Sequence, residues 1–161
     1  DQLFHRRTDD FIRRRIGKNP LEVGADRIAR TAHVTLALLD RIRSATGRDI
    51  KLAWEPGACD GVFAIEVYPA ATLKVRGLIA SGYKKRTRQP TRGEMLAQIK
   101  PLITGLDDHQ NVMLRSADAL DAVLCTLAGA DFLRGDVMPP NLECEVLERE
   151  GWIWVRPPRE T

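Results

Sequence analysis

The chain has 161 residues, of which 43% are hydrophobic and 29% charged, and its formal net charge is +3. Length and composition fit one globular domain with a real core, and no apolar run approaches the roughly 20 residues of a membrane span. Three scattered cysteines without a C-x-x-C spacing argue against a disulfide framework or a zinc site. Because no signal-peptide pattern is visible either, we expect a single domain over residues 1–161, located in the cytoplasm, with reduced thiols.

Two helices are predicted first along the chain. Residues 8–16 have the pattern of a short helix, with Thr8 or Asp9 as its N-cap and a glycine directly after it. Apolar residues then recur at helical spacing from residue 25 to about residue 44, and Gly47 suits the end of that helix.

Short strands are predicted next, at residues 50–54 and 61–68. The second of these reads GVFAIEVY, and its near-continuous apolarity is typical of a strand that is covered on both faces, as in a parallel sheet. Glu66 stands in the middle of it. Because burying an unpaired carboxylate costs several kcal/mol, Glu66 must pair with an arginine or lysine, bind something else, or lie at an opening.

The second half of the chain alternates helices and breaks. The predicted elements are a helix that begins just after Pro69, a mobile basic loop over residues 82–92, helices over 93–104 and 116–133, and a strand over 152–155. Strand–helix–helix–strand order indicates an α/β fold rather than an all-helical one.

Positive charge is concentrated in residues 74–100, which hold a single acid, Glu94. The basic residues there are Lys74, Arg76, Lys84, Lys85, Arg86, Arg88, Arg92 and Lys100. Such a block attracts phosphates even in a nearly neutral protein, although a solvated charged loop is the more common outcome.

Two further carboxylates lie on the helix that Ser116 caps. Asp118 and Asp121 are three residues apart and therefore project from one side of it, in an otherwise apolar stretch. Close carboxylates repel each other, and a hard cation such as Mg²⁺ relieves that repulsion. An acid in a first helical turn, as at Asp118, is also favoured by the helix dipole alone. Together with Glu66, the pair suits two-metal phosphoryl chemistry, so we expect the three carboxylates to converge.

These residues belong to strings that resemble a known family. The strings RRTDD, NPLEVGADRIARTA, EVYPAATLKVRGL, GYK, SADALDA and EGWIWV occur in this order and span nearly the whole chain. They resemble the predicted RNase H-like nucleases numbered 429 among the domains of unknown function, distantly similar to RuvC-type resolvases. The resemblance implies a mixed central sheet flanked by helices, with Glu66, Asp118 and Asp121 as catalytic ligands of Mg²⁺ or Mn²⁺.

One part of the family pattern is not found in the sequence. Members of this family begin with a strand that carries an aspartate, followed by further strands, ahead of the R-x-T-D segment. That segment opens this chain, and its Asp9 and Asp10 do not replace the missing ligand. We therefore expect the missing strands to come from an N-terminal segment of the same protein or from a second chain, as in a homo-oligomer.

Three functions are compatible with these residues. The first is a metal-dependent nuclease in which Lys84, Lys85, Arg86 and Arg88 contact phosphates. Tyr83 would then stack on a base or simply pack, and Arg7 and Asp9 would pair near the site or cap the helix. The second is a non-catalytic module that binds nucleic acid or a protein partner through the same loop. The third, phosphoryl transfer to a small molecule, lacks the support of a glycine-rich phosphate loop.

Overall fold

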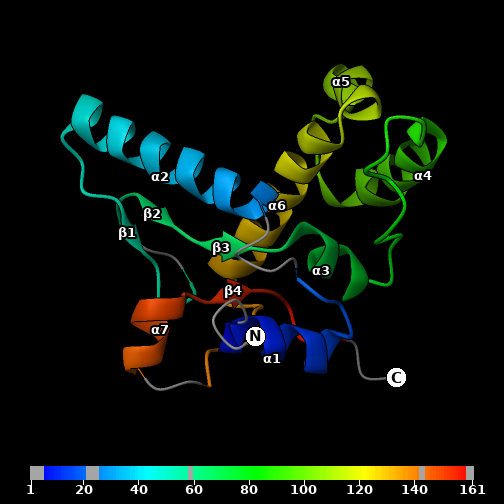
Figure 1. Ribbon diagram of the computed structural model, residues 1–161. Helices are drawn as coiled ribbons and strands as arrows, with labels where there is room; N and C mark the ends of the chain where they lie inside the picture. The colour runs from blue at the N-terminus through cyan, green and yellow to red at the C-terminus, as the bar shows by residue number, and fades with distance from the viewer. Residues whose placement is uncertain (1–5, 21–25, 58–59, 142–143, 159–161) are drawn as a thin grey trace.

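The computed structural model describes residues 6–20, 26–57, 60–141 and 144–158 and shows a mixed α/β arrangement (Figure 1). The helices are α1 (Arg7–Ile16), α2 (Asp26–Thr46), α3 (Pro69–Lys74), α4 (Gln89–Ile99), α5 (Gln110–Arg115), α6 (Ala117–Leu133) and α7 (Cys144–Glu150), with 3₁₀ turns η2 (Lys100–Leu102) and η3 (Asp107–His109); the strands are β1 (Lys51–Leu52), β2 (Phe63–Ala64), β3 (Glu66–Val67) and β4 (Ile153–Trp154).

The four strands of the described residues form two short parallel pairs, and one strand of each pair, β2 or β3, lies within residues 63–67. β2 pairs with β1, with Phe63 opposite Lys51, and β3 pairs with β4, with Glu66 opposite Ile153. The two flanking strands predicted from sequence are therefore present, and both pair with the segment that carries Glu66. This confirms the α/β class.

The strand segment is less covered than its apolarity predicts. Phe63 keeps 40% of its surface exposed, and the Glu66 side chain keeps 38%. The expectation of a strand covered on both faces was wrong. Within the described residues each strand has a single hydrogen-bonded neighbour, so no layered sheet forms around it.

The core lies between the strands and the helices that surround them. In Figure 1, α2 lies on one side of the strands and α1 and α7 on the other, while α4 and α5 gather at one end of α6. The predicted apolar face of α6 is buried at Leu120, Leu124 and Leu127. A second cluster joins α1 to α3 and β4, and a third surrounds Trp152 and Trp154.

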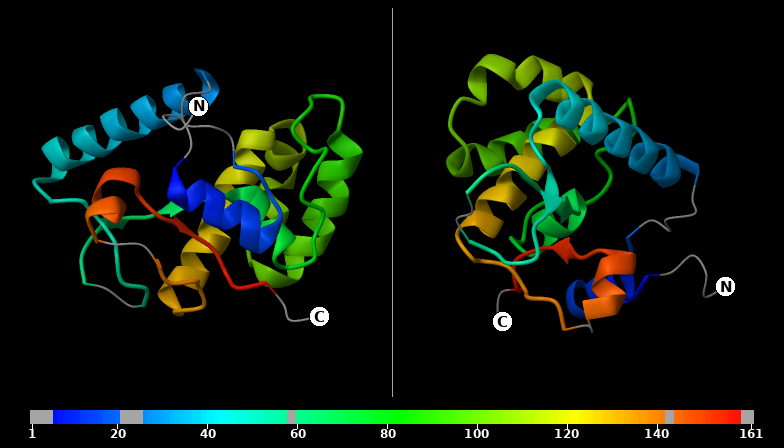
Figure 2. Two further views of the ribbon diagram at one scale, coloured as in Figure 1. Left: turned by 60° about the horizontal axis from the view of Figure 1, so that its bottom comes forward. Right: turned by 90° about the vertical axis from the view of Figure 1, so that its left-hand side faces the viewer.

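Helix α2 has the predicted length but hardly packs. Over residues 30–46 only Leu39 is partly buried, whereas Val34, Leu36 and Leu38 are 69%, 65% and 52% exposed. Figure 2 shows the helix standing apart from the rest of the described chain. No helix in the described ranges, α2 included, is long and apolar enough to cross a membrane.

Several element boundaries differ from the prediction. α4 begins at Gln89 rather than 93, because Pro90 occupies the first turn of a helix, where its missing N–H costs nothing. Between the predicted helices over 93–104 and 116–133 the structure has the short helix α5, which was not predicted, and α7 was not predicted either. The N-cap of α1 is Arg6 rather than Thr8 or Asp9.

Candidate functional site

Glu66 is held by an arginine at the start of α1. Arg6 donates to Glu66 Oε2 and Oε1 over 2.8 and 2.6 Å, a two-point ion pair between residues 60 positions apart. The same guanidinium donates to both oxygens of Asp9 and to the carbonyl of Glu150. All five N–H donors of the arginine are therefore used.

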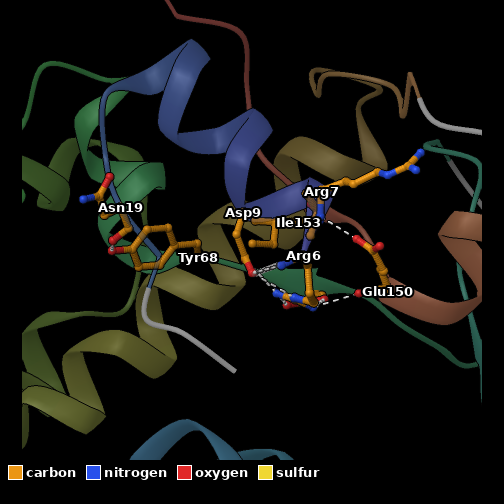
Figure 3. Close-up of polar contacts among 9 residues, drawn as sticks. Arg6, Arg7, Asp9, Asn19, Tyr68, Glu150 and Ile153 are labelled. Atoms are coloured by element: carbon orange, nitrogen blue, oxygen red, sulfur yellow. Dashed lines mark hydrogen bonds and ion pairs between the residues drawn. The ribbon is translucent and has the colours of Figure 1, made fainter. Parts of the chain in front are cut away.

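This cluster joins three elements of the fold. Arg6 and Asp9 also form a capping box, in which the Asp9 carboxylate accepts from the Arg6 backbone N–H. The carboxylate of Glu150, at the end of α7, accepts from the Arg7 backbone N–H. Figure 3 shows Arg6 between Asp9 and Glu150. Burial lowers the pKa of the Arg6 guanidinium, but the hydrogen bonds and charges of Glu66 and Asp9 outweigh burial, and the pKa is raised above its usual value.

Gly151 leaves the room that this cluster needs. Its φ is +77°, a conformation that favours glycine, and a Cβ there would lie 2.9 Å from Glu66 Oε2. A glycine is therefore needed between α7 and β4 for two reasons: the positive φ and the lack of room for a Cβ beside Glu66.

The two aspartates of α6 differ in their surroundings. Ser116 caps the helix as predicted, accepting from the Ala119 N–H, and Asp118 is exposed in the first turn. Asp121 keeps only 19% of its side chain exposed and accepts from the Tyr83 hydroxyl over 2.6 Å, while Lys84 Nζ lies 3.0 Å from its other oxygen.

Tyr83 is a buried hydrogen-bond donor rather than a surface ring. It is 1% exposed, so its ring packs in the core. Of the two roles predicted for Tyr83, stacking on a base or packing, the structure therefore shows packing. Burial, followed by the hydrogen bond to Asp121, raises the pKa of the Tyr83 phenol well above its usual value. Burial and the charge of Asp121 also raise the pKa of Tyr68 and of the Cys125 thiol. These three groups stay protonated at neutral pH.

Residues 83–88 form an exposed basic turn whose backbone is held by hydrogen bonds from the buried Arg92. Lys84, Lys85, Arg86 and Arg88 are exposed, but Arg92 is only 1% exposed. Hydrogen bonds from its guanidinium hold the carbonyls of Tyr83, Lys85, Arg86 and Leu114. The predicted loop therefore ends at residue 88 and is anchored at both ends.

Only part of the basic block faces solvent. Arg76 forms a buried ion pair with Asp131, Lys74 donates to the Gly17 carbonyl, and Lys100 pairs with Asp107 over 2.7 Å. The cationic surface is thus smaller than the composition of residues 74–100 suggests.

Two of the three predicted carboxylates, Glu66 and Asp121, are engaged by separate partners. Glu66 on β3 and Asp121 on α6 lie on elements that pack together, yet Glu66 is paired with Arg6 and Asp121 with Tyr83 and Lys84. Among the described residues no three His, Cys, Asp or Glu side chains cluster as metal ligands. Carboxylates are suitable donors for Mg²⁺ or Mn²⁺, but Arg6 donates to both Glu66 oxygens, so Glu66 would have to exchange this ion pair for a cation in order to hold one.

The predicted pairing of Arg7 with Asp9 is wrong, whereas the alternative role in helix capping is confirmed for Asp9. The arginine that pairs with Asp9 is Arg6, and the Arg7 side chain extends away from Asp9 (Figure 3). Arg6 was missed because adjacent arginines look alike in sequence. The one available signal was spacing, since Asp9 stands three residues after Arg6, as in a capping box.

The strands and this cluster define a mixed α/β protein with an internal carboxylate–guanidinium cluster and an exposed basic turn. Residues 1–143 match the family described as "Protein of unknown function (DUF429)". The chain therefore belongs to this family, as its sequence strings indicate. Comparison with curated proteins gives no match, and comparison with solved structures gives none either.

Proposed function

We propose that this chain is an RNase H-like protein that binds nucleic acid and serves divalent-metal-dependent cleavage of phosphodiesters. The observation that carries the proposal is the exposed turn with Lys85, Arg86 and Arg88, which is anchored beside Asp121 through Lys84. Clustered cations on a fixed turn supply the sequence-independent part of nucleic-acid binding.

Cleavage would rest on Glu66, Asp118 and Asp121. These carboxylates would hold Mg²⁺ or Mn²⁺, which would stabilise charge on the attacked phosphate. Arg6 and a cation cannot both hold both oxygens of Glu66, and we assign no step of cleavage to the arrangement described above. The family resemblance and the packing of β3 on α6 support the three residues as candidates.

A second candidate is a module that binds nucleic acid without cleaving it. The two-point ion pair between Arg6 and Glu66 favours it, because that pair gives Glu66 a complete structural partner. The two candidates share the basic turn and differ in whether Glu66, Asp118 and Asp121 hold a metal ion.

Binding and cleavage are measured separately to decide between them. Anisotropy of a labelled oligothymidine reports binding, and gel analysis of labelled DNA and RNA with added Mn²⁺ reports cleavage. The nuclease proposal expects Mn²⁺-dependent cleavage that Glu66→Gln abolishes while Asp108→Asn, an exposed carboxylate elsewhere, leaves it intact. Binding without cleavage supports the second candidate, and absence of binding overturns both.

We also propose that further strands complete the sheet. Each described strand has one neighbour, and apolar side chains are exposed on β2 and along α2. A second copy of this chain or a further segment of the protein would supply these strands. Sedimentation velocity over a concentration series tests the first source: a constant monomeric mass excludes the second copy.

A further inference from the structure

Arg92 is a buried cation whose guanidinium donates to four main-chain carbonyls. Nη1 donates to Tyr83 and Lys85 over 2.6 and 3.0 Å, Nη2 to Arg86 over 3.4 Å, and Nε to Leu114 over 2.7 Å. Removing a guanidinium from water is unfavourable unless its donors are matched. The backbone of residues 83–86 therefore has to keep the curved path that turns these carbonyls towards Arg92.

That path fixes the direction of the neighbouring N–H groups. In a planar trans peptide, the C=O of one residue and the N–H of the next point in opposite directions. Because the carbonyls of Tyr83, Lys85 and Arg86 point towards Arg92, the N–H groups of Lys84, Arg86 and Thr87 point away from it. Residues 84–88 are all exposed, and these N–H groups point away from the buried guanidinium.

The turn is also fixed to α6. The Tyr83 ring is buried, its hydroxyl donates to Asp121, and Lys84 Nζ lies 3.0 Å from the same carboxylate. The conformation of the turn is thus held by Arg92 beneath it and by Tyr83 at its start. Little ordering is left for a ligand to impose, and preorganisation of this kind favours binding.

We propose that residues 83–88 form a preorganised phosphate-binding turn for a nucleic-acid backbone, with Arg92 as the positioning residue that shapes it. The inference rests on the proposed function and specifies how the same surface binds. Lys85, Arg86 and Arg88 contact successive phosphates, and the outward N–H groups of the turn donate to phosphate oxygens. Because Tyr83 is buried, no aromatic ring of the turn stacks on a base, and recognition is independent of base sequence.

The first test compares nucleic-acid binding by two double variants. One lacks two arginines of the turn, and the other lacks two arginines far from it in the sequence. Arg86→Ala/Arg88→Ala is measured beside Arg14→Ala/Arg15→Ala, which removes the same charge from exposed positions on α1. Affinity for a labelled oligothymidine is measured over a salt series. The slope of log affinity against log salt should become shallower by about 1.4 for the first variant, because each phosphate contact on a single strand contributes about 0.7.

The outcomes separate this inference from the proposed function. If the unaltered chain does not bind, the proposed function fails. If it binds and both double variants lose the same affinity and slope, nucleic-acid binding stands and the assignment to this turn is wrong. The affinities for oligodeoxyadenosine and oligothymidine should lie within a few-fold of each other. A strong preference for one base would contradict recognition of the backbone.

The second test addresses Arg92 itself. Arg92→Lys keeps the charge but offers three donors on one ammonium in place of a planar fork, so it cannot hold all four carbonyls. Binding is measured at a temperature where circular dichroism shows the variant to be folded, beside Ile12→Val, a core change in α1. We expect weaker binding and a shallower salt slope for Arg92→Lys alone. Folded Arg92→Lys that binds like the unaltered chain would show that Arg92 is merely structural, and the positioning role would be wrong.

Discussion

Removing Arg6 should destabilise the protein far more than removing any exposed arginine of the same helix. In Arg6→Gln, the carboxylates of Asp9 and Glu66 lose the guanidinium that joins them, and the Glu150 carbonyl loses its donor. The link between α1, β3 and α7 is then lost. Arg14→Gln on the outer face of α1 is the matched control.

The expected magnitude follows from the exposure of each partner. The Asp9 side chain is 7% exposed, so leaving its charge without a partner costs about 3 kcal/mol, the lower end for a broken buried pair, because Asp9 keeps the Arg6 backbone N–H. Glu66 is 38% exposed and gains water in exchange, so its share is about 0.5–1 kcal/mol. The total of about 3.5–4 kcal/mol corresponds to a fall in Tm of roughly 7–16 °C for a chain of this size.

Urea unfolding followed by circular dichroism measures the free energy of unfolding, and thermal melts give the second readout. Arg6→Lys should recover only part of the loss, because an ammonium has three donors and cannot replace the five hydrogen bonds of the guanidinium. Arg14→Gln should change the free energy of unfolding by less than about 0.5 kcal/mol. If Arg6→Gln costs no more than this control, the five hydrogen bonds of Arg6 do not hold the fold together in solution, and the reasoning is refuted.

Three further predictions concern single positions. Gly151→Ala should cost at least about 1 kcal/mol more than Gly47→Ala in urea unfolding, because both have positive φ but only a Cβ at 151 meets a carboxylate oxygen, and equal costs would contradict this. The raised pKa of Tyr83 means that its contribution to stability is full below its unfolded pKa of 10.0 and is lost as pH rises through the higher folded value. Stability should therefore fall more steeply above pH 10 than in Tyr83→Phe, and parallel pH profiles would argue against it. Asp131→Asn should cost about 3–5 kcal/mol, because it leaves the buried Arg76 without its anion, and an unchanged urea midpoint would count against that pair.

Local signals in the sequence were sufficient for most elements. Gly17 and Gly47 end α1 and α2 in left-handed conformations, and Pro69 begins α3. These signals act over a few residues and need no tertiary context. Burial of α2 was not predictable in the same way, because an amphipathic pattern indicates an apolar face but not whether anything covers it.

The partner of Glu66 depended on tertiary structure. The sequence left three alternatives for this carboxylate, an ion pair, another bound group or an opening, and in the structure it is paired with Arg6 while 38% of its side chain stays exposed. Sequence spacing cannot identify that residue, because the contact spans 60 positions and its formation depends on where α1 docks against β3. Metal ligation by Glu66, Asp118 and Asp121 stays a prediction that the nuclease assay addresses.

The buried arginines explain why counting charges overstates the binding surface of this protein. Arg6, Arg76 and Arg92 all look like surface cations in the sequence, but each is largely enclosed and matched: by two carboxylates, by Asp131, and by backbone carbonyls, respectively. Arg76 with Asp131 sums to zero, and Arg6 with Asp9 and Glu66 sums to a net charge of −1, so neither group adds positive potential at a distance. Arg92 is different, since carbonyl dipoles match its donors without cancelling its net charge. Its positive charge therefore adds to that of the exposed cations directly above it, and this turn is where an anionic polymer should be attracted most strongly.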